Sequence, residues 1–156
     1  MLSGVTNTAT TSNGKLTFLR VAALLAAIGS IISPLLATGP LSGTGPLNAL
    51  HGMVGNMNFV FAILAGVGGV LWGRASGNKG LMFHALSLPV LAVIQIALGE
   101  MHLTMVHIVL GFAYLLAAVA LFTLALRKPG TAARPTAETT RTRGVLTSED
   151  VPGSSY

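Results

Sequence analysis

Two short segments of the sequence combine histidine with methionine, each near the start of a long apolar stretch. They are LNALHGMVGNMN, residues 47–58, and MHLTMVHIVLG, residues 101–111. In each segment a histidine, His51 or His107, is followed four residues later by a glycine, Gly55 or Gly111. Residues four apart lie on one face of a helix, so each glycine is predicted to lie one turn from its histidine on the same face.

Two imidazoles with no bulky side chain beside them are the ligand set that a planar metal macrocycle requires. We therefore expect His51 and His107 to be the axial ligands of one haem, with Gly55 and Gly111 beside it. Two alternatives stay open at this point. The histidines could hold another metal, or they could serve only packing and hydrogen bonding.

The methionines of the same segments suggest which other metal that could be. They form two pairs with the spacing M-x-x-x-M, which places both thioethers of a pair on one helical face: Met53 with Met57, and Met101 with Met105. Thioether and imidazole ligands suit copper(I), so a copper-binding protein is an alternative prediction. The simpler interpretation is that these flexible apolar side chains fill irregular space, including space around a haem.

Three further polar residues require an interpretation. Glu100 and His102 lie in a short connection, where exposure to water explains both and a role at the edge of a cofactor is the alternative. His84 is predicted to lie in the opposite membrane leaflet and to form a hydrogen bond across the bundle, not to bind a metal.

The composition indicates that these segments fold in a lipid bilayer and not in water. Of the 156 residues, 52% are hydrophobic and 8% are charged, against about 25% charged in soluble domains. Four blocks reach the length needed to cross a bilayer, about 18–38, 48–72, 81–99 and 104–126. We predict an all-α integral membrane four-helix bundle, up-down-up-down, over residues 16–126, in which lipid is the main partner.

The distribution of basic residues predicts the topology. Lysine and arginine precede the first block, lie between the second and third, and follow the fourth, whereas the other two connections have none. Both termini should therefore be cytoplasmic, in a bacterial inner membrane. Residues 1–15 and 127–156 are polar and predicted to be disordered tails. A cleaved signal peptide is an alternative for the first block, but its length favours retention.

Several classes of function are excluded or disfavoured. The absence of cysteine excludes thiolate ligands and disulfides. The net charge of +5 follows the topology, with no basic cluster interleaved with aromatic residues, so nucleic acid is not an expected partner. No nucleotide-binding or hydrolase motif is present, and we do not expect an enzyme that acts on its own.

The segments LHGMVGN (50–56), IQIALG (94–99) and VHIVLG (106–111) resemble one half of the haem A synthase family, and small four-helix relatives of it. The likeness covers about residues 18–126. It implies a four-helix bundle with bis-histidine b-type haem near the outer face, with His51 and His107 as the ligands.

The sequence also departs from that family. The synthase has a glutamate three residues before a ligand histidine and an arginine directly after it. Here these places hold Asn48 and Gly52 in one helix, and Thr104 and Ile108 in the other. We therefore expect haem binding for electron transfer or haem handling, beside a larger membrane redox complex or in a homo-oligomer, and not haem A synthesis. A cofactor-free subunit with a structural or assembly role is the remaining alternative.

Overall fold

The structure, a computed structural model, describes residues 3–37 and 45–129, which form four long helices and no strand. They are α1 (Ser3–Leu36), α3 (Gly45–Ser76), α4 (Lys79–Glu100) and α5 (Thr104–Leu126). Each contains a segment long and apolar enough to cross a membrane, with mean hydropathy between 1.7 and 2.5. The prediction of an all-α membrane bundle is confirmed.

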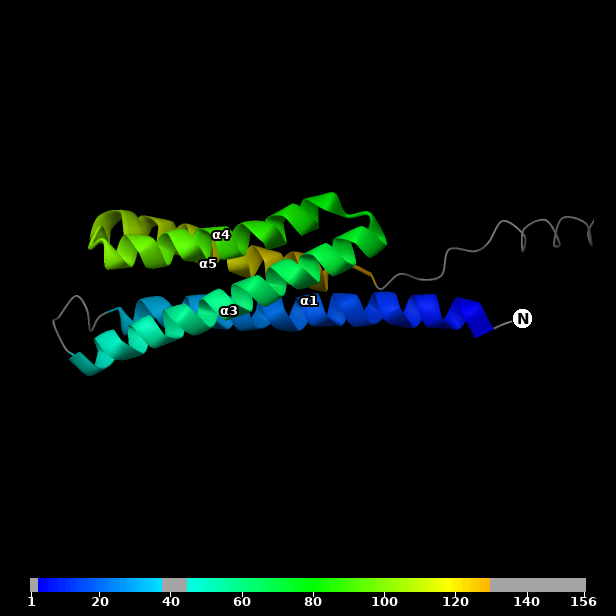
Figure 1. The fold of residues 1–156 in the computed structure, drawn as a ribbon, viewed down its shortest axis with the longest axis horizontal. Coiled ribbons are helices and arrows are strands. Elements are labelled where there is room, and N and C mark those ends of the chain that lie inside the picture. Colours follow the sequence, from blue (N-terminus) through cyan, green and yellow to red (C-terminus); the bar gives the residue numbers. More distant parts are fainter. Residues whose placement is uncertain (1–2, 38–44, 130–156) are drawn as a thin grey trace, which may run out of the picture.

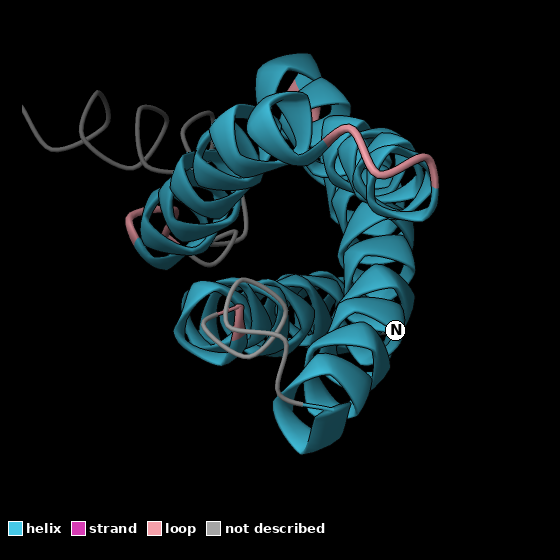
Figure 2. Ribbon diagram, turned by 90° about the vertical axis from the view of Figure 1, so that its left-hand side faces the viewer, coloured by secondary structure: helices cyan, strands magenta, loops and turns pink. Residues whose placement is uncertain are grey.

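The helices pack as a ring in which sequence neighbours are also neighbours in space (Figures 1 and 2). α1 packs against α3 and α5, and α4 also packs against α3 and α5. In the described part of the chain the backbones of α3 and α5 do not meet, because these helices lie diagonally opposite each other. Any contact between α3 and α5 is therefore made by side chains across the centre of the bundle.

The interior is built mainly from small residues, while many large apolar side chains point outward. Ala62 and Ala65 of α3, with Ala85 of α4 and Ala118 of α5, are fully buried. By contrast Phe83, Val109 and Leu116 each expose more than 60% of their surface. Small residues let membrane helices approach closely, and lipid covers the outward side chains, so this distribution fits a bilayer.

Three of the four helices are longer than their apolar blocks. α3 reaches from Gly45 to Ser76, where the expected block covers 48–72, and α4 is longer by a few residues. α1 begins at Ser3, which differs from the expected disordered tail over residues 1–15. Hydropathy marks the part of a helix inside the hydrocarbon, whereas elongation of an existing helix continues into water at little cost. The expected tail beyond residue 129 lies outside the described residues.

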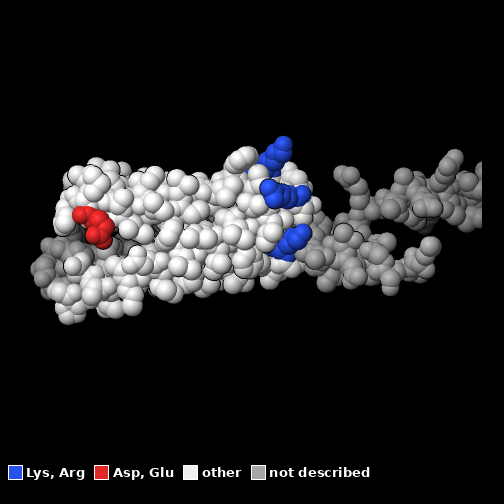
Figure 3. All heavy atoms as spheres, in the orientation of Figure 1, with Lys and Arg blue, Asp and Glu red and all other residues white. Residues whose placement is uncertain are grey.

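Charged residues separate to the two ends of the described bundle (Figure 3). Lysines and arginines gather at one end, and Glu100 lies at the other. At the basic end the Arg20 guanidinium donates to the main-chain oxygens of Ala125, Leu126 and Lys128, at 3.1, 3.4 and 2.7 Å. Arg20 thus caps the C-terminus of α5, whose last carbonyls have no partner within the helix.

Candidate functional site

The structure brings His51 of α3 and His107 of α5 together across the centre of the bundle. Their ring centroids lie 6.1 Å apart and the ring planes are inclined by 69°. The two helices are diagonal partners, so this contact is made by the imidazoles and not by adjacent backbones. Each ring is partly buried. They lie near the starts of α3 and α5, and these helix starts are at the end of the bundle opposite the lysines and arginines (Figures 1 and 3).

Each ring is held by a hydrogen bond from the same ring nitrogen to a main-chain carbonyl. Nδ1 of His51 lies 3.0 Å from the Ser33 oxygen in α1, and Nδ1 of His107 lies 3.0 Å from the Gln95 oxygen in α4. Because a carbonyl oxygen only accepts, both Nδ1 atoms must carry the hydrogen. In a neutral imidazole this leaves Nε2 with a free lone pair.

The two free lone pairs make this pair a suitable donor set for one metal ion. Metal-bound histidines commonly donate their other ring nitrogen to a backbone carbonyl, which sets the tautomer and the ring orientation. A metal–imidazole bond is about 2 Å long, so two imidazoles on opposite sides of one ion have centroids roughly 6 Å apart. The observed centroid distance of 6.1 Å is close to that value, and rotation about either metal–nitrogen bond would leave it unchanged.

Gln95 and Gly99 of α4 support His107. In addition to accepting from the imidazole, Gln95 donates from its side-chain Nε2 to the His107 main-chain oxygen, at 3.0 Å. A Cβ added at Gly99 would lie 3.5 Å from the His107 ring, so the ring rests against this glycine. Gly111 lies against Gln95: an added Cβ would lie 3.4 Å from the Gln95 amide nitrogen.

Gly55 differs from Gly111 because no atom of a neighbouring helix lies against it. A Cβ added at Gly55 would meet no atom within 4 Å, although the residue is half-buried and shares a helical face with His51. One turn further along, Asn58 is buried against α1, where Gly29 makes room for its side chain. With its amide oriented to satisfy both groups, Asn58 donates to Ala26 and accepts from the Ser30 N–H. The face of α3 that continues from His51 through Asn58, Ala62 and Ala65 is therefore buried beyond Gly55, with space beside the histidine.

Tyr114 extends the His107 face by two turns into the bundle. The residue is 6% exposed, and its hydroxyl has no hydrogen-bond partner among the described residues. An unpaired buried hydroxyl is costly, so this group is suited to a bound molecule or an ordered water. The donor set, the open side of Gly55 and this hydroxyl all fit a cofactor near the histidine pair.

The methionines do not line this site. Met53, Met57, Met101 and Met105 each expose more than half of their surface, up to 78% for Met105. In the described part of the chain no three histidine, aspartate or glutamate side chains form a group that could hold a metal ion. These four side chains lie largely on the outer surface of the bundle.

The other polar residues considered from the sequence, His84, Glu100 and His102, occupy positions that the fold explains. His84 donates from Nε2 to the Ala117 oxygen of α5, at 2.9 Å, so it forms the expected hydrogen bond, to a neighbouring helix and not across the centre of the bundle. Glu100 and His102 are exposed at the end of α4. His102 has a positive φ of 57° and forms part of the turn into α5.

Three supporting residues were not identified from the sequence. Ser33 acts through its main-chain oxygen, which any residue type would supply, so no sequence signal exists for it. Gln95 does carry a signal, since it is a polar side chain in the middle of an apolar helix, where such residues are commonly functional. Gly99 is the last residue of the segment IQIALG, which also contains Gln95. The sequence points to Gly99 as a supporting residue only if Gln95 has first been recognised as functional.

Comparison with known proteins gives no information about the function of this site. The chain matches no protein-family model, and no curated protein or solved structure is detectably similar to it. Its function must therefore be inferred from the chemistry of the histidine pair itself.

Proposed function

We propose that this chain is a small integral membrane b-type haem protein with His51 and His107 as axial ligands, acting in electron transfer or haem handling beside a larger redox system. One observation carries the proposal: two imidazoles from diagonal helices meet at 6.1 Å, each with Nδ1 donated to a main-chain oxygen. This arrangement leaves both Nε2 atoms for one iron.

The residues of the chain would bind and orient the haem. The carbonyls of Ser33 and Gln95 hold the rings in the metal-binding tautomer, and Gly55 leaves room beside His51. With no cysteine in the sequence, attachment through thioethers is impossible, so a c-type haem is excluded and the haem would be bound without covalent attachment. A haem iron with two histidine ligands has no open position, which favours one-electron transfer over binding of oxygen.

The proposal includes an orientation and a family relationship. The basic end of the bundle faces the cytoplasm, which places the histidine pair in the outer leaflet. Haem propionates at this end would rely on neutral groups such as Asn48 and Thr104, and on backbone N–H groups. The relationship is to one half of the haem A synthase family, in a binding and not a synthetic role.

The visible absorption spectrum of the detergent-solubilised protein tests this proposal. The full chain, expressed with ample haem, should show a Soret band and, after reduction with dithionite, sharp α and β bands. His51→Ala and His107→Ala should each lose or shift these bands, because each removes an axial ligand. His107→Gly with added imidazole should recover part of the spectrum, since free imidazole can replace the missing side chain.

His84→Ala is the matched control. It removes a histidine that also donates to a main-chain oxygen of a neighbouring helix, so any general loss of packing appears here as well. The spectrum of His84→Ala should remain unchanged. A colourless parent protein, or loss of the bands in His84→Ala alone, would contradict the assignment of His51 and His107.

A further inference from the structure

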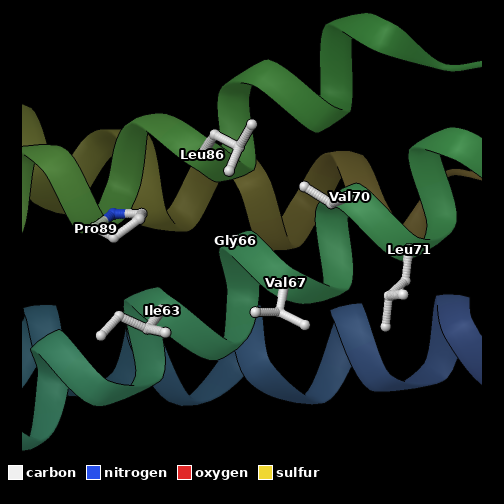
Figure 4. A pocket seen from close by; sticks show the side chains of 7 residues that line it. All are labelled: Ile63, Gly66, Val67, Val70, Leu71, Leu86 and Pro89. Atoms are coloured by element: carbon white, nitrogen blue, oxygen red, sulfur yellow. The ribbon is translucent and has the colours of Figure 1, made fainter.

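A groove runs along the outside of the bundle between α3 and α4, away from the histidine pair. One section holds about 300 Å³ and is lined only by apolar residues, among them Ile63, Val67 and Pro89 (Figure 4). A second section of about 280 Å³ shares Val70 and Leu86 with the first, and it includes Arg74 and Lys79 in its lining. The two sections form one continuous surface, the α3–α4 groove.

Close packing of the two helices explains why the groove exists. Gly66 and Gly73 of α3 line it and have no side chain to fill it. A Cβ added at Gly73 would come within 2.7 Å of the Met82 Cβ, and one at Gly66 would lie 3.4 Å from Pro89. The backbones therefore approach closely at these glycines, and the larger side chains on either side form the walls.

The charges at the end of the groove lack a counterpart in the described part of the chain. Arg74 and Lys79 are both exposed, and no ion pair links either to a carboxylate among residues 3–37 and 45–129. Within those residues the acidic side chain is Glu100, which lies at the opposite end of the bundle (Figure 3). Two cations without a carboxylate partner, at the end of an apolar groove, are complementary to a molecule with an anionic head and a hydrocarbon chain.

The length of the groove matches one leaflet of a bilayer. Along α3, the distance from Arg74 to Ile63 corresponds to about 16 Å of helix at 1.5 Å per residue. Half of a hydrocarbon core of about 30 Å is close to that value. An acyl chain whose headgroup lies at the membrane surface would therefore follow the groove to the middle of the bilayer.

We infer that the α3–α4 groove binds one anionic phospholipid of the surrounding membrane, with its phosphate between Arg74 and Lys79 and an acyl chain along Val67 and Pro89. The site is independent of haem, so the two proposals can fail separately. Electrostatic attraction of the two cations sets the headgroup preference, and burial of the acyl chain supplies the headgroup-independent part of the affinity.

Native mass spectrometry of the full chain tests this inference. Delipidated protein is mixed with micelles containing an anionic or a zwitterionic phospholipid of identical acyl chains, and retained lipid per chain is measured. The parent protein should retain about ten- to thirty-fold more of the anionic lipid, since two basic groups contribute about 1 kcal/mol each. The double variant Arg74→Gln/Lys79→Gln should lose this preference and keep its absorption spectrum.

The double variant Arg127→Gln/Lys128→Gln is the matched control, because it removes two cations from the same end of the bundle but outside the groove. It should keep the preference. Val67→Phe, which fills the groove, should lower retention of both lipids. Circular dichroism and gel filtration verify that each variant is folded. The inference would be overturned if the parent protein showed no preference for the anionic lipid, or if both double variants lost that preference equally. It would also be overturned if Val67→Phe retained as much of both lipids as the parent.

Discussion

His51 and His107 differ from His84 in the ring nitrogen that each uses for its hydrogen bond. The first two engage Nδ1, whereas His84 engages Nε2. The remaining nitrogen of His84 is Nδ1, which lies next to its own Cβ and is hindered as a ligand to a large cofactor. The remaining Nε2 atoms of the other two are at the far end of the ring. Tautomer and geometry together therefore distinguish ligand candidates from a structural histidine.

Gly55 and Gly52 provide a test at the scale of single residues. An added Cβ meets no atom within 4 Å at either glycine, so the described chain itself has room for a side chain at both. Only Gly55 is half-buried and on the face of His51. Gly55→Leu should lower the haem content per chain by about tenfold or more, which corresponds to about 1.4 kcal/mol of binding free energy.

Gly52→Leu is the control for this substitution and should retain the haem content of the parent. The measurement is the ratio of Soret to protein absorbance after purification, with circular dichroism as the test of folding. Equal haem content in both variants would show that the macrocycle does not lie beside Gly55.

At the scale of elements, the turn between α4 and α5 sets the position of His107 relative to Gln95. Leu103 N–H donates to the Leu98 oxygen at 3.0 Å, and His102 N–H donates to the Gly99 oxygen at 3.1 Å. These two bonds form a Schellman motif, in which His102 occupies the left-handed position with φ of 57°. Glycine is the usual residue there, because a Cβ crowds the following carbonyl.

His102→Gly should therefore keep or increase stability, by up to about 1 kcal/mol, whereas His102→Val should lose about 1–2 kcal/mol. Thermal unfolding in detergent, followed by circular dichroism, measures both changes. The absorption spectrum of His102→Gly should match that of the parent. A lost Soret band in this variant would instead assign His102 to the cofactor, and a lower midpoint than in His102→Val would contradict the turn assignment.

At the scale of the whole molecule, basic residues and the histidine pair occupy opposite ends of the bundle. The positive-inside rule predicts a topology with the start of α1, the α3–α4 connection and the end of α5 in the cytoplasm. In that topology Arg74 and Lys79 would lie at the inner surface and the His51–His107 pair toward the outer surface.

The absence of cysteine makes this topology easy to measure. Ala75→Cys and Met101→Cys each introduce one thiol at an exposed position, at opposite ends of the bundle. In intact cells a membrane-impermeant maleimide should label Met101→Cys and leave Ala75→Cys unlabelled until the membrane is permeabilised. The parent protein, which has no cysteine, is the control and should remain unlabelled. The reverse pattern would invert the orientation and place the histidine pair at the inner leaflet.

Much of the fold follows from the sequence, because four long apolar blocks in lipid can satisfy their backbone polar groups only as helices. The buried small-residue face of α3 also follows, since helical periodicity places residues such as Ala62, Ala65 and Gly69 on one side. The helix ends do not follow from hydropathy, because a helix can continue beyond the hydrocarbon, as α1 and α3 do.

The sequence by itself determined the residue types at the candidate site and their approximate depth. Only the tertiary structure decided that His51 and His107 meet across the bundle diagonal and that main-chain oxygens of Ser33 and Gln95 hold both Nδ1 atoms. It also showed that Gly111 lies against the Gln95 side chain. The physical reason is that a carbonyl is present at every residue, so periodicity and composition cannot indicate which carbonyl an imidazole will reach once the helices have packed.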